Sequence, residues 1–179
     1  IRQSLQQYGF EILVMDVFKY SGEDSINLLV KINNSQNVNV DQQLLKTELQ
    51  NGKKYAEGFR DRKEFILKYL KEAINLGKVV IFGAGHQASA FITFLGLEKY
   101  ISFIADDNPN KIGFFMPKSK IPIVSSKELY NNNISLCLLA MNSLNDEKMI
   151  SNLSELKQKG VKIRSIFPNS KYSVFNEII

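Results

Sequence analysis

The chain has 179 residues, of which 44% are hydrophobic and 23% are charged, a composition typical of a soluble globular protein with a sizeable core. The formal net charge is +5, but the Lys and Arg residues are scattered among Asp and Glu, which argues against a nucleic-acid-binding surface. No apolar run approaches the ~20 residues of a membrane span and no signal-peptide pattern is present, so neither a membrane partner nor secretion is expected.

The chain contains one cysteine and one histidine. Cys137 lies within the apolar run 136–139 and is typical of a small buried hydrophobe in a strand. With these two residues alone, neither a disulfide within the chain nor a structural metal site is expected. The pattern agrees with a reducing compartment, and we expect a cytoplasmic protein.

The N-terminal residues resemble the middle of a domain. The first residue is Ile1, and an amphipathic stretch runs directly into a strand pattern, so we expect a fragment of a longer protein. Residues 1–8 are typical of the end of a helix, and Gly9 fits a helix C-cap. Two strands are predicted at 10–17 and 25–32, paired as a hairpin across turn residues 20–24, and an Asn-rich linker follows over 33–39.

Helical periodicity extends over residues 41–76. Gly52 and Gly58 interrupt the pattern, which predicts two helices or one bent helix. We therefore divide the chain into three parts: the tail end of an upstream domain over 1–40, a helical linker over 41–77, and a C-terminal domain over 78–179.

From Lys78 onward, predicted strands alternate with predicted helices. Apolar runs predict five strands, at 79–82, 101–105, 122–124, 135–141 and 161–166. Helices are expected after the first strand, after Ser125 or Ser126, and over 146–159. This alternation predicts an α/β fold, a Rossmann-like three-layer domain with a mostly parallel five-stranded sheet, preceded by the hairpin and the helical linker.

The segment 83–88, Gly-Ala-Gly-His-Gln-Ala, follows the first of these strands and opens a helix. It matches the relaxed fingerprint G-x-G-x-x-[GA] of phosphate-binding loops. Gly83 permits the tight turn, Gly85 lets a ligand approach the backbone, and the helix N-terminus offers free N–H groups and the positive end of its dipole. The loop therefore predicts a phosphate-bearing ligand, and a tight turn that binds nothing is the alternative.

Two acidic residues follow the second strand. Asp106 lies 23 residues after Gly83, near the ~20 expected for an acid that binds a ribose 2′-hydroxyl group. The alternative for Asp106 and Asp107 is an Asp-Asp-Asn-Pro turn, in which the side chains bond to the local backbone, and the two interpretations are compatible.

Three further features are candidates for ligand contacts. His86, at the start of the helix, could donate to a phosphate, or it could be an exposed histidine without a role. Asn142 follows the fourth strand at the carboxyl edge of the sheet, where ligands bind in such folds, although capping of a helix by Asn145 or Ser143 also explains this segment. Residues 114–116, Phe-Phe-Met, are too apolar for a plain loop and would cover the ligand or dock onto another domain.

These features resemble the C-terminal domain of S-adenosylmethionine-dependent sugar C-methyltransferases. The similarity rests on the glycine-alanine loop, on Asp-Asp-Asn-Pro-Asn-Lys-Ile-Gly at 106–113, on Pro117 and on Ile-Pro-Ile-Val at 121–124. Asn142 and Glu147 match a later Trp-Asn…Glu element of the family. Residues 8–12 and the hairpin are similar to the closing strands of the family's methyltransferase domain.

Three positions depart from the family pattern. Gln87 stands where a basic residue is common, Met141 where a Trp is usual, and Lys118 where a Gly follows the proline. These departures leave the identity of the sugar nucleotide open.

The resemblance implies a C-terminal, substrate-binding part of a methyltransferase that acts on nucleotide-linked sugars. S-adenosylmethionine, the zinc-binding domain and the catalytic bases would lie upstream, so no cofactor and no catalytic residue is expected in this fragment. The expected partners are a nucleotide-linked sugar, or a similar phosphate-bearing small molecule, and the upstream methyltransferase domain of the same protein. The expected ligand contacts are Gly83, Ala84, Gly85, His86, Gln87, Asp106, Asp107, Asn108, Lys111 and Asn142.

Two other functions fit parts of the sequence. An NAD(P)-binding module of an oxidoreductase accommodates the glycine fingerprint and Asp106 equally well, but no obvious catalytic Tyr-Lys or His set follows. A nucleotide-sugar-binding regulatory domain, as found before some sugar acyltransferases, shares the Asp-Asp-Asn-Pro element. Such domains begin directly at the first Rossmann strand, whereas this chain carries a hairpin before it.

Overall fold

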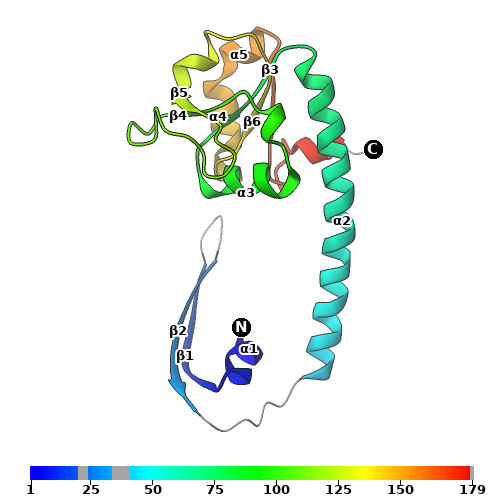
Figure 1. Cartoon of the computed structure of the whole chain (residues 1–179), viewed down its shortest axis with the longest axis vertical. Helices are drawn as coiled ribbons and strands as arrows, with labels where there is room; N and C mark the ends of the chain where they lie inside the picture. The colour runs from blue at the N-terminus through cyan, green and yellow to red at the C-terminus, as the bar shows by residue number, and fades with distance from the viewer. Residues whose placement is uncertain (20–23, 34–40, 178–179) are drawn as a thin grey trace. The chain divides into compact units, whose positions relative to one another are not determined.

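The computed structural model describes residues 1–19, 24–33 and 41–177. They fall into two compact units, Ile1–Gly58 and Phe59–Ile179 (Figure 1). The predicted hairpin turn and most of the predicted Asn-rich linker lie outside the described residues.

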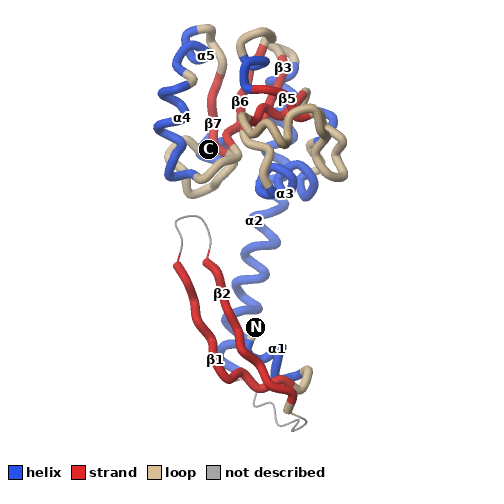
Figure 2. The backbone as a smooth tube through the Cα atoms, turned by 90° about the vertical axis from the view of Figure 1, so that its left-hand side faces the viewer, coloured by secondary structure: helices blue, strands red, loops and turns tan. Residues whose placement is uncertain are grey.

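The first unit opens with a short helix and an antiparallel hairpin. Helix α1 (Arg2–Gln7) ends before Gly9, whose φ of +79° is the left-handed conformation expected of a helix C-cap glycine. Strand β1 (Phe10–Lys19) pairs with β2 (Asp24–Ile32), and the two lie side by side in Figure 2. The predicted helix end and hairpin are therefore confirmed, with a β-bulge between Ile12 and Val14 that the sequence did not indicate.

Helix α2 (Gln42–Ile74) is one continuous helix of 33 residues. Asp41 begins it, because its Oδ1 accepts hydrogen bonds from the N–H groups of Gln43 and Leu44 at 3.0 and 2.9 Å. The predicted alternative of two helices is wrong, because the helix runs through Gly52 and Gly58 without a break. Each glycine lowers helix stability by about 1 kcal/mol relative to Ala, but it keeps its N–H and C=O groups, so the hydrogen-bond ladder of a long helix continues through it.

The second unit contains the predicted parallel sheet. Its strands are β3 (Lys78–Phe82), β4 (Phe103–Asp106), β5 (Ile123–Ser125), β6 (Ile134–Leu139) and β7 (Lys162–Ser165). Their order is β5-β4-β3-β6-β7, and all four neighbouring pairs are parallel. The chain runs outward from β3 to β5 and then returns to the other side of β3 with β6. The Rossmann-like α/β fold is thus confirmed, with its topological switch point between β3 and β6.

Helices cover both faces of this sheet and complete the three layers. On one face, Val79 and Ile81 of β3 belong to a buried cluster with Ile66 and Leu70 of α2 and Ile92 of helix α3 (His86–Leu95). On the other face, the alternate β3 residues pack in a second cluster with residues around helices α4 (Asp146–Asn152) and α5 (Ser154–Gln158), namely Val80, Phe82, Leu153 and Leu156. The alternation along β3 follows from the two-residue period of a strand.

The C-terminal half of α2 is fastened to the sheet layer within this unit. Ser135 Oγ of β6 donates a hydrogen bond to the carbonyl of Ala73 at 2.8 Å. The ring of Phe175, in the 3₁₀ helix η4 (Val174–Glu177), lies 6.3 Å from that of Phe65 and 6.4 Å from that of Phe91, between α2 and α3.

Two of the predicted helices differ from the structure. The helix predicted over 146–159 is two short helices that meet at Leu153, whose φ and ψ of −95° and 21° leave the helical region so that its side chain is buried against the sheet. The helix predicted after Ser125 or Ser126 is a single 3₁₀ turn, η2 (Ser126–Leu129), with Ser125 as its cap. In the described part of the chain, no helix combines the length and the apolar character needed to cross a membrane.

Candidate functional site

Gly83 is required by the fold at the end of β3. Its φ is +106°, a region that other L-residues rarely adopt, and its N–H donates to the carbonyl of Ala105 at 2.8 Å. A side-chain Cβ at this position would lie 2.8 Å from Cγ of Met141 and 3.3 Å from the carbonyl oxygen of Ala140. This glycine therefore allows the loop to pass close to the end of β6 at the switch point.

Gly85 is a glycine for a different reason. Its φ and ψ of −104° and 179° are open to any residue, and a Cβ there would meet no atom within 4 Å. Gly85 is the N-cap of α3, yet no side chain caps the helix and no acidic residue lies in its first turn. Gly85 thus leaves open space beside the N-terminus of α3, which carries the positive end of the helix dipole.

Asp106 holds the glycine loop from the neighbouring strand. Its Oδ2 accepts hydrogen bonds from the N–H of Ala84 at 2.7 Å and from Nζ of Lys111 at 3.2 Å, and its Oδ1 accepts one from the N–H of Asn108 at 2.8 Å. Burial raises the pKa of Asp106, but the hydrogen bonds of Asn108, Ala84 and Lys111 and the Lys111 charge together lower it below its ordinary value. Asp106 is therefore an ionised brace between the glycine loop and the Asp-Asn-Pro turn.

A groove of about 640 Å³ opens beside the glycine loop, within the second unit. One wall is the face of α3 that carries Ser89, Ala90, Thr93 and Phe94, and the other belongs to the loop between β4 and β5 (residues 107–122). Ala84, Gly85 and His86 line this groove where α3 begins. The volume is in the range of small-molecule sites.

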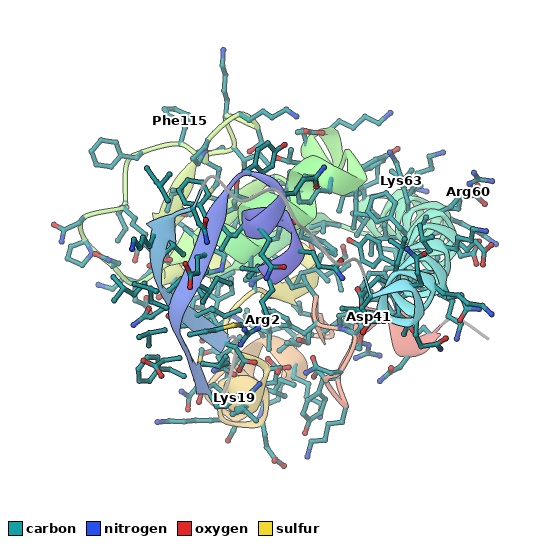
Figure 3. The ribbon with its side chains drawn as sticks, turned by 90° about the horizontal axis from the view of Figure 1, so that it is seen from below. Arg2, Lys19, Asp41, Arg60, Lys63 and Phe115 are labelled. Carbon is teal, nitrogen blue, oxygen red and sulfur yellow. The ribbon has the colours of Figure 1, made fainter. Side chains whose placement is uncertain are left out.

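The two walls of the groove carry exposed aromatic rings. Phe94 of α3 is 67% exposed and Phe114 of the 107–122 loop is 64% exposed, while Met116 and Ile123 are buried beneath them. Of the apolar residues 114–116, Phe114 and Met116 line the groove, whereas Phe115 does not. Phe115, labelled in Figure 3, lies on the loop and is exposed. The rings offer flat apolar surfaces to a ligand. Contact with a ligand would remove these surfaces from water, which is favourable.

The ionisable residues that line the groove are all basic, and two of them are lysines. Lys111 and Lys118 come from the 107–122 loop, His86 comes from α3, and no Asp or Glu is among the lining residues of the described chain. Nε2 of His86 lies 3.1 Å from Nε2 of Gln87. The field within the groove therefore favours an anion.

The structure brings some of the predicted contact residues together. Ala84, Gly85, His86 and Lys111 line one groove. Gly83 and Asp106 do not line it, but Gly83 allows the turn of the loop, and Asp106 accepts hydrogen bonds from Ala84 and Lys111. Gln87, Asp107, Asn108 and Asn142 do not line it. Whether any of these residues touches a ligand stays a prediction.

Asn142 serves the local backbone. Its Oδ1 accepts a hydrogen bond from the N–H of Leu144 at 3.0 Å and so caps the 3₁₀ helix η3 (Ser143–Asn145). Asn145 is the N-cap residue of α4 and Glu147 lies in its first turn, as predicted, but the side chain of Asn145 makes no capping hydrogen bond. The buried acid of this segment is Asp146, which is 2% exposed and accepts a hydrogen bond from Ser170 Oγ at 2.6 Å.

The sequence analysis missed part of the groove, namely Ser89, Thr93, Phe94 and Lys118. Ser89 and Thr93 share one face of α3, because positions four apart lie on the same side, and Phe94 follows Thr93 at the edge of that face. Extending the predicted binding site from the glycine loop along that face of α3 would have included them. Lys118 gave a weaker signal, as a departure from the family pattern.

Among the described residues, no group of three or more His, Cys, Asp or Glu side chains could hold a metal ion.

Comparison with known families gives one match. The family model for the C-methyltransferase C-terminal domain matches residues 31–168 of the chain. A comparison with curated proteins found no match.

Several solved structures are similar to part of the chain. UDP-D-quinovosamine 4-dehydrogenase from Vibrio fischeri aligns at 21% identity over 57% of this chain and 83% of its own, with a TM-score of 0.39. RSP, a Rex-family repressor, aligns at 19% identity over 62% of this chain and 58% of its own, with a TM-score of 0.41. RSP in complex with beta-NADH aligns at 19% identity over 62% and 59%, with a TM-score of 0.42. These scores are too low for the matches to bear on function.

Proposed function

Because the chain belongs to the C-methyltransferase C-terminal domain family, we propose that its Rossmann-like unit binds the phosphate-bearing part of a nucleotide-linked sugar. The unit positions this ligand for methyl transfer carried out by another domain of the same protein. Its contribution to the reaction is orientation of the substrate, which raises the rate by holding the reacting group in place.

One observation carries this proposal. The uncapped N-terminus of α3, the open space at Gly85 and the ammonium group of Lys111 meet at the same end of one groove. A phosphate there would accept hydrogen bonds from the first N–H groups of the helix and face the positive end of its dipole. Asp106 fixes both Ala84 and Lys111, so this arrangement exists before the ligand binds.

The rest of the groove suits the remainder of such a ligand. Phe94 and Phe114 present apolar ring faces against which a nucleobase or the flat face of a sugar can pack. Ser89, Thr93 and Asn110 add hydrogen-bonding groups for hydroxyls. An anionic end next to an apolar end is the pattern that a nucleotide-linked sugar presents.

The charge of the groove is less suited to S-adenosylmethionine. The methyl donor carries a sulfonium cation, an ammonium group and one carboxylate, so its net charge is positive, and the ionisable residues lining the groove, His86, Lys111 and Lys118, are basic. Like charges that are brought together in a partly desolvated site repel one another. This favours the methyl acceptor as the ligand of the groove, with the donor bound in a different domain.

The NAD(P)-binding alternative needs a carboxylate that accepts hydrogen bonds from a ribose. Asp106 already accepts three from the protein, through Ala84, Asn108 and Lys111. Its capacity for a ribose diol is reduced accordingly, which weakens the contact that this alternative requires.

Thermal shift of the purified chain tests the proposal, with a thymidine diphosphate sugar, a uridine diphosphate sugar, NAD and S-adenosylmethionine as separate ligands. A ligand that binds only the folded state raises the melting temperature in proportion to the logarithm of its concentration over Kd. We expect a shift with a nucleotide sugar and none with S-adenosylmethionine. A shift with NAD alone would establish the oxidoreductase alternative instead.

A further inference from the structure

The tip of the 107–122 loop has an unusual backbone. The N–H of Lys120 donates to the carbonyl of Met116 at 3.0 Å, and the N–H of Ser119 donates to the carbonyl of Pro117 at 2.7 Å. The second of these bonds closes a three-residue turn centred on Lys118, whose φ is +63°. Turns of this kind with a positive central φ are rare and strained, and Gly is the residue that adopts them without penalty.

Lys118 lines the groove, whereas Lys120, with a similar φ of +55°, does not. Lys111, the other lysine of the groove, has its charge balanced by Asp106 at 3.2 Å. Within the described residues, Lys118 has no ion pair or hydrogen bond from its side chain to balance its charge. The groove therefore contains one neutralised cation beside the glycine loop and one unbalanced cation on its rim.

We propose that Lys118 is a specificity-determining residue, which selects ligands that carry a further anionic group beyond the diphosphate held at the glycine loop. The inference rests on the proposed function, since it concerns the same groove. The two phosphates of a nucleotide-linked sugar have the first N–H groups of α3 and the ammonium group of Lys111 as partners, so the charge of Lys118 is available to a further anion on the ligand. A carboxylate on the sugar is the simplest such group.

The test uses ligands that differ in this one group. UDP-glucose and UDP-glucuronate share the base, the phosphates and the sugar ring, and differ by a neutral hydroxymethyl group against a carboxylate. Isothermal titration of the full chain is performed with this pair and with the corresponding thymidine diphosphate pair. We expect the uronate to bind about fivefold more tightly, as for a solvent-exposed ion pair, and this preference to fall at high salt.

Three variants separate the effect of the Lys118 charge from the effect of its strained backbone. Lys118→Gly and Lys120→Gly both relieve a positive φ, so both should raise the melting temperature, but only Lys118→Gly should abolish the preference for the uronate while leaving binding of the neutral sugar nucleotide. Lys118→Arg keeps the charge and should keep the preference.

The outcomes distinguish this inference from the proposed function. Equal binding of the two ligands by the wild-type chain, or a preference that survives in Lys118→Gly, overturns the role of Lys118 and leaves the proposed function standing. Binding of none of the four nucleotide sugars rejects both.

Discussion

The backbone N–H of Ala84 donates a hydrogen bond to Oδ2 of Asp106 at 2.7 Å, which joins the loop after β3 to the end of β4. The same oxygen accepts from Lys111 at 3.2 Å. One carboxylate thereby fixes the glycine loop and orients a groove cation, two features that the proposed phosphate site requires.

Removing this carboxylate should destabilise the second unit. Asp106→Ala removes the acceptor of the part-buried N–H of Ala84, and the loss of such a partner costs about 1–3 kcal/mol for a buried group, whereas the exposed N–H of Asn108 can bond to water instead. We expect the free energy of unfolding, measured by urea denaturation, to fall by about that amount. Asp107→Ala is the matched control, because Asp107 is exposed and should change stability by less than about 0.5 kcal/mol. Equal stabilities of the two variants would contradict the bracing role.

The same carboxylate predicts a pH dependence. The pKa of Asp106 in the folded chain lies below its ordinary value of 3.8, so the unfolded chain binds its proton first as the pH falls. The stabilisation by Asp106 is therefore fully present above pH 3.8 and is lost as the pH falls through the folded-state pKa. The difference in unfolding free energy between wild type and Asp106→Ala should be larger at pH 7 than near the lower pKa. A difference that grows on acidification would show that the sign is wrong.

The two glycines of the loop should respond differently to alanine. Gly83→Ala places a Cβ 2.8 Å from Cγ of Met141 at a φ of +106°, and we expect a loss of about 1–3 kcal/mol in stability. Gly85→Ala has an ordinary φ and open space around its Cβ, so its cost should be about 1 kcal/mol or less. Its Cβ would occupy the space open to a phosphate, and affinity for a nucleotide sugar should fall. Thermal denaturation and titration of both variants measure these effects separately.

Cys137 should be inert in the folded chain. It lies fully buried in β6, and burial raises the pKa of its thiol to about 12. Because the thiolate is the reactive form, a thiol reagent such as DTNB should label Cys137 only after denaturation. Rapid labelling in native buffer would mean that β6 opens readily to solvent.

The central sheet was predictable because each of its strands is an apolar run between turn residues, as at 79–82, and buried parallel strands need no other pattern. The glycine loop was predictable because the turn after β3 needs a positive φ at Gly83, which few residues other than glycine adopt. For helix α2 the sequence left two helices or one bent helix open, since Gly52 and Gly58 weaken it locally while the length of the whole helix decides its stability.

The groove was harder to predict, since its walls come from segments that meet only in the folded chain. Phe94 and Phe114 are far apart in sequence, and each resembles an ordinary exposed aromatic residue. The role of Asp106 could not be decided either, because a ribose contact and a bond to Ala84 require the same residue at the same strand end. Lys118 stands where the related family has Gly, and its φ of +63° gives the physical reason for that preference.

The most direct test of the phosphate site is a ¹H–¹⁵N correlation spectrum of the labelled chain, recorded during titration with a uridine or thymidine diphosphate sugar. Amide signals report on each N–H group, and those of a helix N-terminus shift when they donate to a phosphate. We predict the largest shifts at Gly85, His86 and Gln87, with further shifts at Lys111 and Phe114 in the opposite wall of the groove. Shifts confined to the segment after β6, around Asn142, or no shifts with any nucleotide sugar, would contradict binding at the glycine loop.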